Sequence, residues 1–127
     1  GRSLLLPGLV VAAFVAYHLL HFTLGATHPA HFALVDAEGR HDVYGMVVAG
    51  FRQWPVTVAY LVAQVALFFH LSHAVSSAFQ SLGVTHPRLA FLKGRFGLLL
   101  AGAVLAGNAS IPLAVATGLV PCDCGAR

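Results

Sequence analysis

Three long stretches of this sequence contain no Asp, Glu, Lys or Arg. They run from 4 to 24, from 55 to 82 and from 96 to 120. Each is long enough to cross the hydrocarbon core of a bilayer, which takes roughly 20 residues of helix. Lipid cannot pair with backbone groups, and three such segments cannot close a barrel. We therefore predict an all-α integral membrane protein with three transmembrane helices, forming one membrane-anchor domain over residues 1–127.

Composition supports a membrane environment and argues against nucleic acid as a partner. Hydrophobic residues make up 58% of the chain and charged residues 9%, with a mean hydropathy of +0.83. Soluble domains carry roughly 25% charged residues. The basic residues are scattered, so no run of Lys and Arg exists that could follow a phosphate backbone. This composition therefore favours a lipid environment.

The distribution of charge predicts the orientation of the helices. The turn between the second and third stretches, residues 83–95, contains Arg88, Lys93 and Arg95 and no acid. Positive residues favour the cytoplasmic side, so we place this turn there. The first helix then runs outward, the second inward and the third outward. Residues 25–54, expected to be an ordered polar loop with short interfacial pieces, and the C-terminal Cys122-Asp123-Cys124 then lie on the outer side.

Polar and small residues in the third stretch predict its local structure. Pro112 lies inside it and is expected to kink the helix, with Asn108 and Ser110 near enough to pair with the freed carbonyls. Small residues in the same stretch suggest a closely packed helix face.

Histidine is the residue type that points to chemistry. His18 and His21 form a His-x-x-His pair in the first stretch, and His70 and His73 form another in the second. Residues three apart share a helix face, and ionisable groups at membrane depth usually face the protein interior and have a function. Imidazole is a ligand of haem iron and of one iron in Rieske clusters. The alternative is that these histidines form hydrogen bonds between helices, and for His21 and His73 individually we favour a structural or pocket-lining role.

The sequence around both pairs resembles the third and fourth helices of the five-helix cytochrome b-type anchors of succinate dehydrogenase and fumarate reductase. The matching residues are Tyr17-His18-Leu19-Leu20-His21-Phe22-Thr23, the run from His70 to Gly83 that begins His70-Leu71-Ser72-His73, His86-Pro87-Arg88 and Ser110-Ile111-Pro112-Leu113. The resemblance implies a five-helix-type bundle in a bacterial cell membrane, with flavoprotein and iron-sulfur subunits as partners and quinone as the electron acceptor.

The resemblance also implies a cofactor. In that family the histidines corresponding to His18 and His70 each ligate one of two stacked haems b. The other two ligands come from two earlier helices, so we expect further transmembrane helices from another chain or from a part of this polypeptide that is missing here. Ala74 stands where the family usually has Gly, and the added methyl would crowd a porphyrin.

The C-terminal Cys-x-Cys is not a usual feature of the family. Two thiolates and two imidazoles form the ligand set of a Rieske-type [2Fe-2S] centre, which some haem-less relatives are thought to carry. Cys122 and Cys124 fall on the same side as His18 and His21 in the predicted orientation. We therefore keep this cluster as the alternative to haem b.

A quinone site needs apolar walls and a few hydrogen-bonding groups. The candidates are Tyr17, Tyr60, Gln64, Ser77 and Gln80. Two other functions compete with quinone reduction. A metal or proton transporter would use paired histidines, but such proteins usually also carry buried carboxylates, which the three stretches lack. An assembly subunit without a cofactor would use its histidines structurally.

Overall fold

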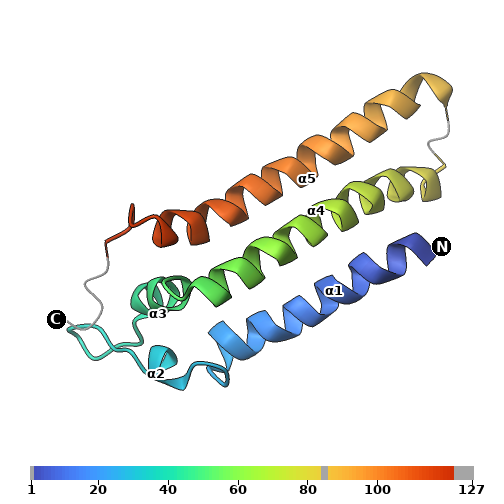
Figure 1. The fold of residues 1–127 in the computed structure, drawn as a ribbon. Helices are drawn as coiled ribbons and strands as arrows, with labels where there is room; N and C mark the ends of the chain where they lie inside the picture. Colours follow the sequence, from blue (N-terminus) through green and yellow to red (C-terminus); the bar gives the residue numbers. More distant parts are fainter. Residues whose placement is uncertain (1, 84–85, 122–127) are drawn as a thin grey trace.

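The computed structural model describes residues 2–83 and 86–121, and most of this part of the chain is helical (Figure 1). The only β-bridge among these residues pairs Val35 with His41 in antiparallel orientation. The elements in chain order are α1 (Arg2–His18), the π-helix η1 (Leu19–Thr23), α2 (Pro29–Phe32), α3 (Val43–Phe51), α4 (Trp54–Ser81) and α5 (Pro87–Ala116).

The three long helices lie side by side in alternating directions, with α4 between α1 and α5 (Figure 1). Helix α4 packs against both neighbours, and α3 contacts α4 and α5 at one end. The apolar parts are Leu5–Thr23, Trp54–Ser81 and Gly94–Ala116, each long and apolar enough to cross a membrane. The predicted number of membrane-length helices is confirmed.

The third helix differs from its prediction at both ends. It begins at Pro87 rather than at residue 96, and proline fits the first turn of a helix. Arg88, Lys93 and Arg95, which were expected in the turn, therefore belong to the helix. It ends at Ala116 rather than at residue 120. Gly118 there has a φ of +77°, and the N–H of Leu119 donates to the Ala114 carbonyl at 3.0 Å. A left-handed glycine of this kind ends a helix.

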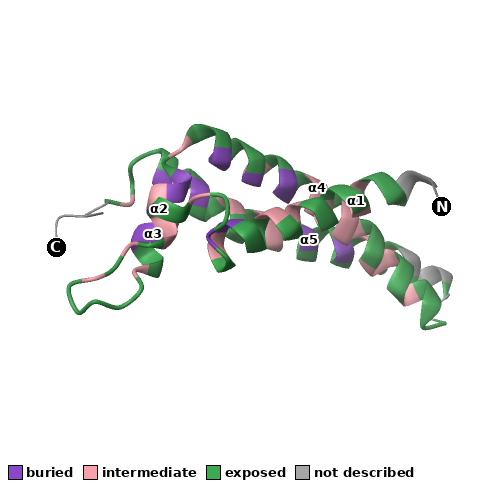
Figure 2. Cartoon of the chain, turned by 90° about the horizontal axis from the view of Figure 1, so that it is seen from below, coloured by how far each residue is buried: buried purple, intermediate pink, exposed green. Residues whose placement is uncertain are grey.

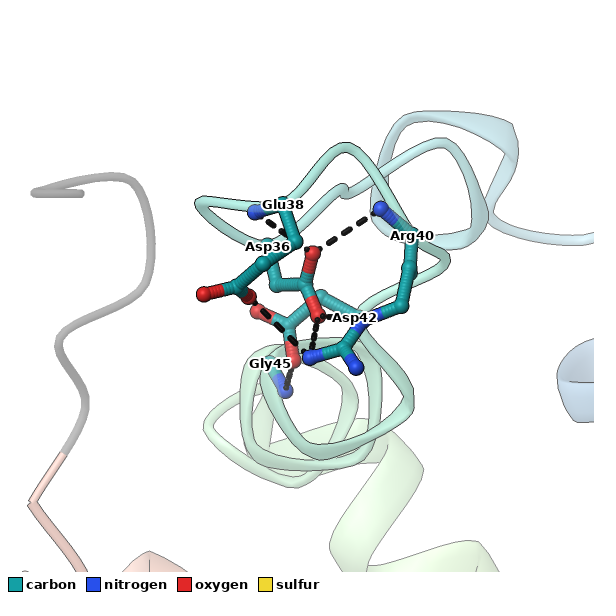
Figure 3. Close-up of polar contacts among 5 residues, drawn as sticks. All are labelled: Asp36, Glu38, Arg40, Asp42 and Gly45. Carbon is teal, nitrogen blue, oxygen red and sulfur yellow. Dashed lines mark hydrogen bonds and ion pairs between the residues drawn. The ribbon is translucent and has the colours of Figure 1, made fainter.

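The segment between α1 and α4 contains the short helical pieces that were expected. The Asp42 carboxylate accepts a hydrogen bond from the Gly45 N–H at 2.8 Å and so caps the start of α3 (Figure 3). Asp36 accepts from the backbone N–H of Arg40 at 2.9 Å and from the Arg40 guanidinium at 2.8 Å. The Arg40 backbone N–H, followed by its guanidinium, lowers the pKa of Asp36. This polar loop is therefore ordered by its own charges.

Buried side chains are concentrated at the end of the bundle where α3 lies. The core there consists of Val48, Phe51, Val56, Tyr60 and Val115. Much of the remaining surface of the long helices is exposed (Figure 2). Leu5 and Leu99, for example, are 71% and 73% exposed. Exposed apolar surface on this scale suits contact with lipid or with further helices rather than with water.

Helix α5 lies close to the backbone of α4 at Gly97, which gives a test of the packing. A methyl group at this position would lie 3.1 Å from the main-chain oxygen of Ser72, which cannot easily move. We expect Gly97→Ala to lower the free energy of unfolding by about 1 kcal/mol or more. Gly107→Ala is the control, because a methyl there meets nothing within 4 Å, and alanine favours helix. Unfolding of both variants in detergent, followed by circular dichroism, would show equal effects if α4 and α5 did not pack at Gly97.

Candidate functional site

The helices line an open cavity of about 490 Å³, which is the candidate site. Its walls come from α1, η1, α3, α4 and α5, and its lining is mainly apolar and aromatic. Four polar residues also line it: His18, Tyr60, Gln64 and Asn108. Tyr60 and Gln64 were predicted as quinone-binding residues and His18 as a cofactor ligand, so the fold brings three predicted residues to one space.

The Tyr60 hydroxyl organises the first polar group. It lies 3.2 Å from Nδ1 of His21 and 3.4 Å from Nδ1 of His18. A hydroxyl has one proton to donate and two lone pairs, so it can donate to one imidazole and accept from the other. The edges of Phe14 and Phe51 hold the Tyr60 ring, with centroids 5.0 Å and 4.9 Å away. Histidines of the first membrane-length helix are thus joined to the second.

The π-helix η1 gives His18 and His21 different surroundings. His18 is exposed and lines the cavity, whereas His21 is 1% exposed. A π-helical turn is wider than an α-helical turn and so changes the direction of the residues that it carries. The His21 ring packs against Gly50, where an added methyl would lie 3.2 Å from its Nε2 and Cε1. The spacing predicted a shared helix face, and a structural or pocket-lining role was favoured for His21, but the π-helical turn was not predicted.

Two further histidines, His28 and His31, form a cluster between His21 and the loop. The His21 and His28 rings have centroids 4.6 Å apart. Nε2 of His28 lies 3.2 Å from the Gln53 side-chain oxygen, and Nε2 of His31 lies 3.5 Å from the Gln53 side-chain nitrogen. Burial lowers the pKa of His31, and the nearby His28 lowers it further. Sequence reasoning missed this cluster, because Gln53, which joins its histidines, lies 25 and 22 residues from His28 and His31 and gives no signal of its own.

The second polar group in the cavity is a pair of amides. The Asn108 side-chain nitrogen donates to the Gln64 side-chain oxygen at 3.1 Å and so joins α5 to α4. Asn108 was expected to pair with carbonyls freed by Pro112, and this expectation is wrong for its side chain. Ser110 donates to the Gly107 carbonyl at 2.6 Å instead.

The second His-x-x-His pair lies at a different level of the bundle. His70 is ten residues beyond Tyr60 on α4, which corresponds to about 15 Å along the helix axis. Its ring packs on α1 at Gly8, where an added methyl would lie 3.5 Å from Cε1. Nδ1 of His70 is buried and has no hydrogen-bond partner within residues 2–83 and 86–121. His73 is exposed.

The predicted cofactor ligands fit iron to different degrees. A metal-bound imidazole usually offers one nitrogen to the metal and a hydrogen bond from the other. His18 fits, because its Nδ1 faces Tyr60 and Nε2 is left free. His70 fits less well by this criterion, because the described residues give its Nδ1 no hydrogen-bond partner. His21 fits poorly, since its Nε2 is buried against Gly50.

A closed metal site is not assembled by the described part of the chain. No group of three or more His, Cys, Asp or Glu among these residues could hold a metal ion. Cys122 and Cys124, predicted for the Rieske-type alternative, lie outside the described residues. The described geometry offers single imidazoles, so a haem held by one of them would need its second ligand from elsewhere.

The remaining quinone candidates do not line the cavity. Tyr17 packs beside it, with ring centroids 5.6 Å from His21 and 5.9 Å from Tyr60. Ser77 and Gln80 are exposed on the far half of α4. Asn108 is the cavity residue that the candidates omitted, although a polar side chain deep in an apolar stretch was a signal for it.

Comparison with known protein families, curated proteins and solved structures gives no match. The resemblance to succinate dehydrogenase anchors therefore stays a prediction from the residues that carry it.

Removal of the Tyr60 hydroxyl tests its bridging role. We expect Tyr60→Phe to lower the free energy of unfolding by about 1–3 kcal/mol, because it leaves the buried Nδ1 of His21 without a partner. Tyr44→Phe is the control: its hydroxyl also makes a hydrogen bond, to the Pro121 carbonyl at 2.9 Å, but at an exposed position. Denaturation in detergent measures both variants. Equal losses would contradict a special role for Tyr60.

The lowered pKa of His31 predicts a loss of stability in acid. The unfolded chain takes up a proton near pH 6.5 and the folded chain at lower pH, so His31 contributes stability above about pH 6.5 that is lost as the pH falls. We expect the thermal midpoint to fall between pH 8 and pH 5, and to fall less in His31→Gln. His41→Gln, at an exposed loop position, is the control. An unchanged pH dependence in His31→Gln would show that other groups cause it.

Proposed function

We propose that this chain is the membrane anchor of a quinone-reducing electron-transfer complex of the succinate dehydrogenase type. In this proposal it spans a bacterial cell membrane, and flavoprotein and iron-sulfur subunits dock on its cytoplasmic side. The observation that carries the proposal is the cavity, in which His18, Tyr60, Gln64 and Asn108 face an apolar and aromatic space. Small-molecule sites typically combine such walls with a few directed polar groups.

The chemistry of the lining favours quinone over an ion. Gln64 and Asn108 carry uncharged amides, Tyr60 a phenol and His18 an imidazole, and none of the lining residues is a carboxylate. Cation pathways in membranes usually include buried carboxylates, and the three apolar stretches contain none. Amides, a phenol and an imidazole are instead suited to the carbonyl oxygens of a quinone. For this reason a metal or proton transporter is the less favoured function.

Reduction of a quinone adds two electrons and two protons and gives a hydroquinone. The Tyr60 hydroxyl has one proton, so it would donate either to a carbonyl oxygen of the quinone or to Nδ1 of His18, whose Nε2–H would then donate to that oxygen. Either hydrogen bond would favour the negative charge that develops there. The Tyr60 hydroxyl also contacts His21, whose ring lies against His28 in the loop cluster. Protons consumed at that oxygen could therefore come from the side of the loop, and the electrons from the iron-sulfur subunit.

We infer that His70 is the haem ligand, with the second ligand supplied by another helix. A haem b at this level would pass electrons one at a time between the iron-sulfur subunit and the cavity. His18 also fits an axial ligand, but the amides in its cavity suit a quinone better than the face of a porphyrin. A second haem at His18, and a Rieske-type cluster on Cys122, Cys124, His18 and His21, are the alternatives.

Optical and EPR spectra of the complex, purified through a tag on this chain, test the proposal. We expect a b-type α band in the reduced-minus-oxidised spectrum that is lost in His70→Ala and kept in His18→Ala. His18→Ala should lower quinone reduction about tenfold or more, while reduction of a dye by the flavoprotein continues. The control is His73→Ala, which changes an exposed residue of the same helix and should keep both signals.

Other outcomes would assign the histidines differently. A haem signal lost in His18→Ala would place haem in the cavity. A [2Fe-2S] signal lost in Cys122→Ser would favour the Rieske-type alternative. Absence of both signals, together with normal quinone reduction in His18→Ala, would contradict the proposal and favour structural histidines.

A further inference from the structure

The amide pair formed by Gln64 and Asn108 stands apart from the histidine cluster and has unused hydrogen-bonding capacity. Gln64 is only 7% exposed, yet its described hydrogen bond uses the side-chain oxygen alone. The Gln64 NH₂ group has no described partner and is not one of the buried unpaired atoms of the described residues, so it is accessible in a residue that lines the cavity. A donor at an otherwise apolar wall is suited to an acceptor on a ligand.

Asn108 adds an acceptor at the same place. Its main-chain carbonyl would normally accept from the N–H of residue 112, but that residue is Pro112 and has no N–H. Ser110, the nearest hydroxyl in the sequence, donates to Gly107 instead. Pro112 and Asn108 both line the cavity. The amide pair thus offers a donor for a carbonyl and an acceptor for a hydroxyl.

The position of the amide pair relative to Tyr60 suggests which ligand it fits. Gln64 is four residues beyond Tyr60 on α4, so the two share a helix face and are about 6 Å apart along the axis. This distance is comparable to that between the two oxygens across a six-membered quinone ring. Both residues line the same cavity, whose aromatic wall includes Phe14 and Phe22.

We propose that Gln64 and Asn108 bind one oxygen of a 1,4-quinone while Tyr60 and His18 bind the other. The headgroup then lies along α4, with its two oxygens directed toward the two ends of the polar wall. Gln64 donates to the carbonyl of the oxidised form, and Asn108 accepts from the hydroxyl of the reduced form. Asn108 also positions Gln64, because its side chain holds the Gln64 oxygen and leaves the NH₂ group for the ligand. This inference rests on the proposed function and adds the orientation of the substrate.

Infrared spectroscopy with labelled quinone tests the orientation directly. The probes are a short-chain 1,4-naphthoquinone and a short-chain 1,4-benzoquinone, each with ¹³C at one ring carbonyl, bound to the purified complex. In the wild type we expect both carbonyl bands to be shifted from those of the free quinone. Gln64→Leu should return one band to its free position and leave the other, and Asn108→Leu should weaken the shift of the same band. Gln80→Leu is the matched control, since Gln80 is an exposed glutamine on the same helix, outside the cavity.

Kinetics provide a second readout on the same variants. We expect Gln64→Leu to raise KM for the quinone about tenfold, the effect of losing one hydrogen bond, with dye reduction by the flavoprotein unchanged. Bound quinone whose two bands are the same in Gln64→Leu and Asn108→Leu as in the wild type would overturn this inference and leave the proposed function intact. Failure of the wild-type complex to bind either quinone, as expected if lipid chains fill the cavity, would overturn both.

Discussion

The Tyr60 hydroxyl lies between two imidazoles of the neighbouring helix, and much of the candidate site depends on this contact. In an apolar environment a buried polar group has no water to replace a missing partner, so a single hydroxyl can fix how two helices meet. The contact joins α4 to the end of α1, where the helix changes to the π-form of η1. It also places His18 at the wall of the cavity while His21 is buried.

The same principle applies to two other polar groups, one between long helices and one at the loop. Gln64 and Asn108 pair across α4 and α5, and His28, Gln53 and His31 form a cluster at the loop end. Between these groups the helices contact one another mainly through apolar side chains and close approaches such as Gly97. These two groups lie at one cavity and at its loop side, which is the arrangement that a hydrogen-bonding, proton-consuming substrate would use, whereas the polar residues of α4 from His70 to Ser81 lie away from it.

The two His-x-x-His pairs show both the reach and the limit of sequence reasoning. The structure places His18, Tyr60 and Gln64 at the wall of one cavity, and their roles as cofactor or quinone ligands stay predictions. The spacing could not show that η1 separates the roles of His18 and His21, because the choice between an α- and a π-turn depends on packing. Nor could it exclude Ser77 and Gln80 from the cavity, since apolar residues surround every face of such a helix and no amphipathic pattern marks its inner side.

The sequence by itself determined the helical class and the number of membrane-length helices, because long uncharged stretches leave the backbone no other way to pair its polar groups. It also determined which rare polar side chains had to find partners. Only the tertiary structure decided which partners they found: His18 and His21 meet Tyr60, Gln64 meets Asn108, and His70 lies against Gly8. These pairings join residues up to 62 positions apart, and they depend on how the helices are aligned along their axes, which local patterns do not encode.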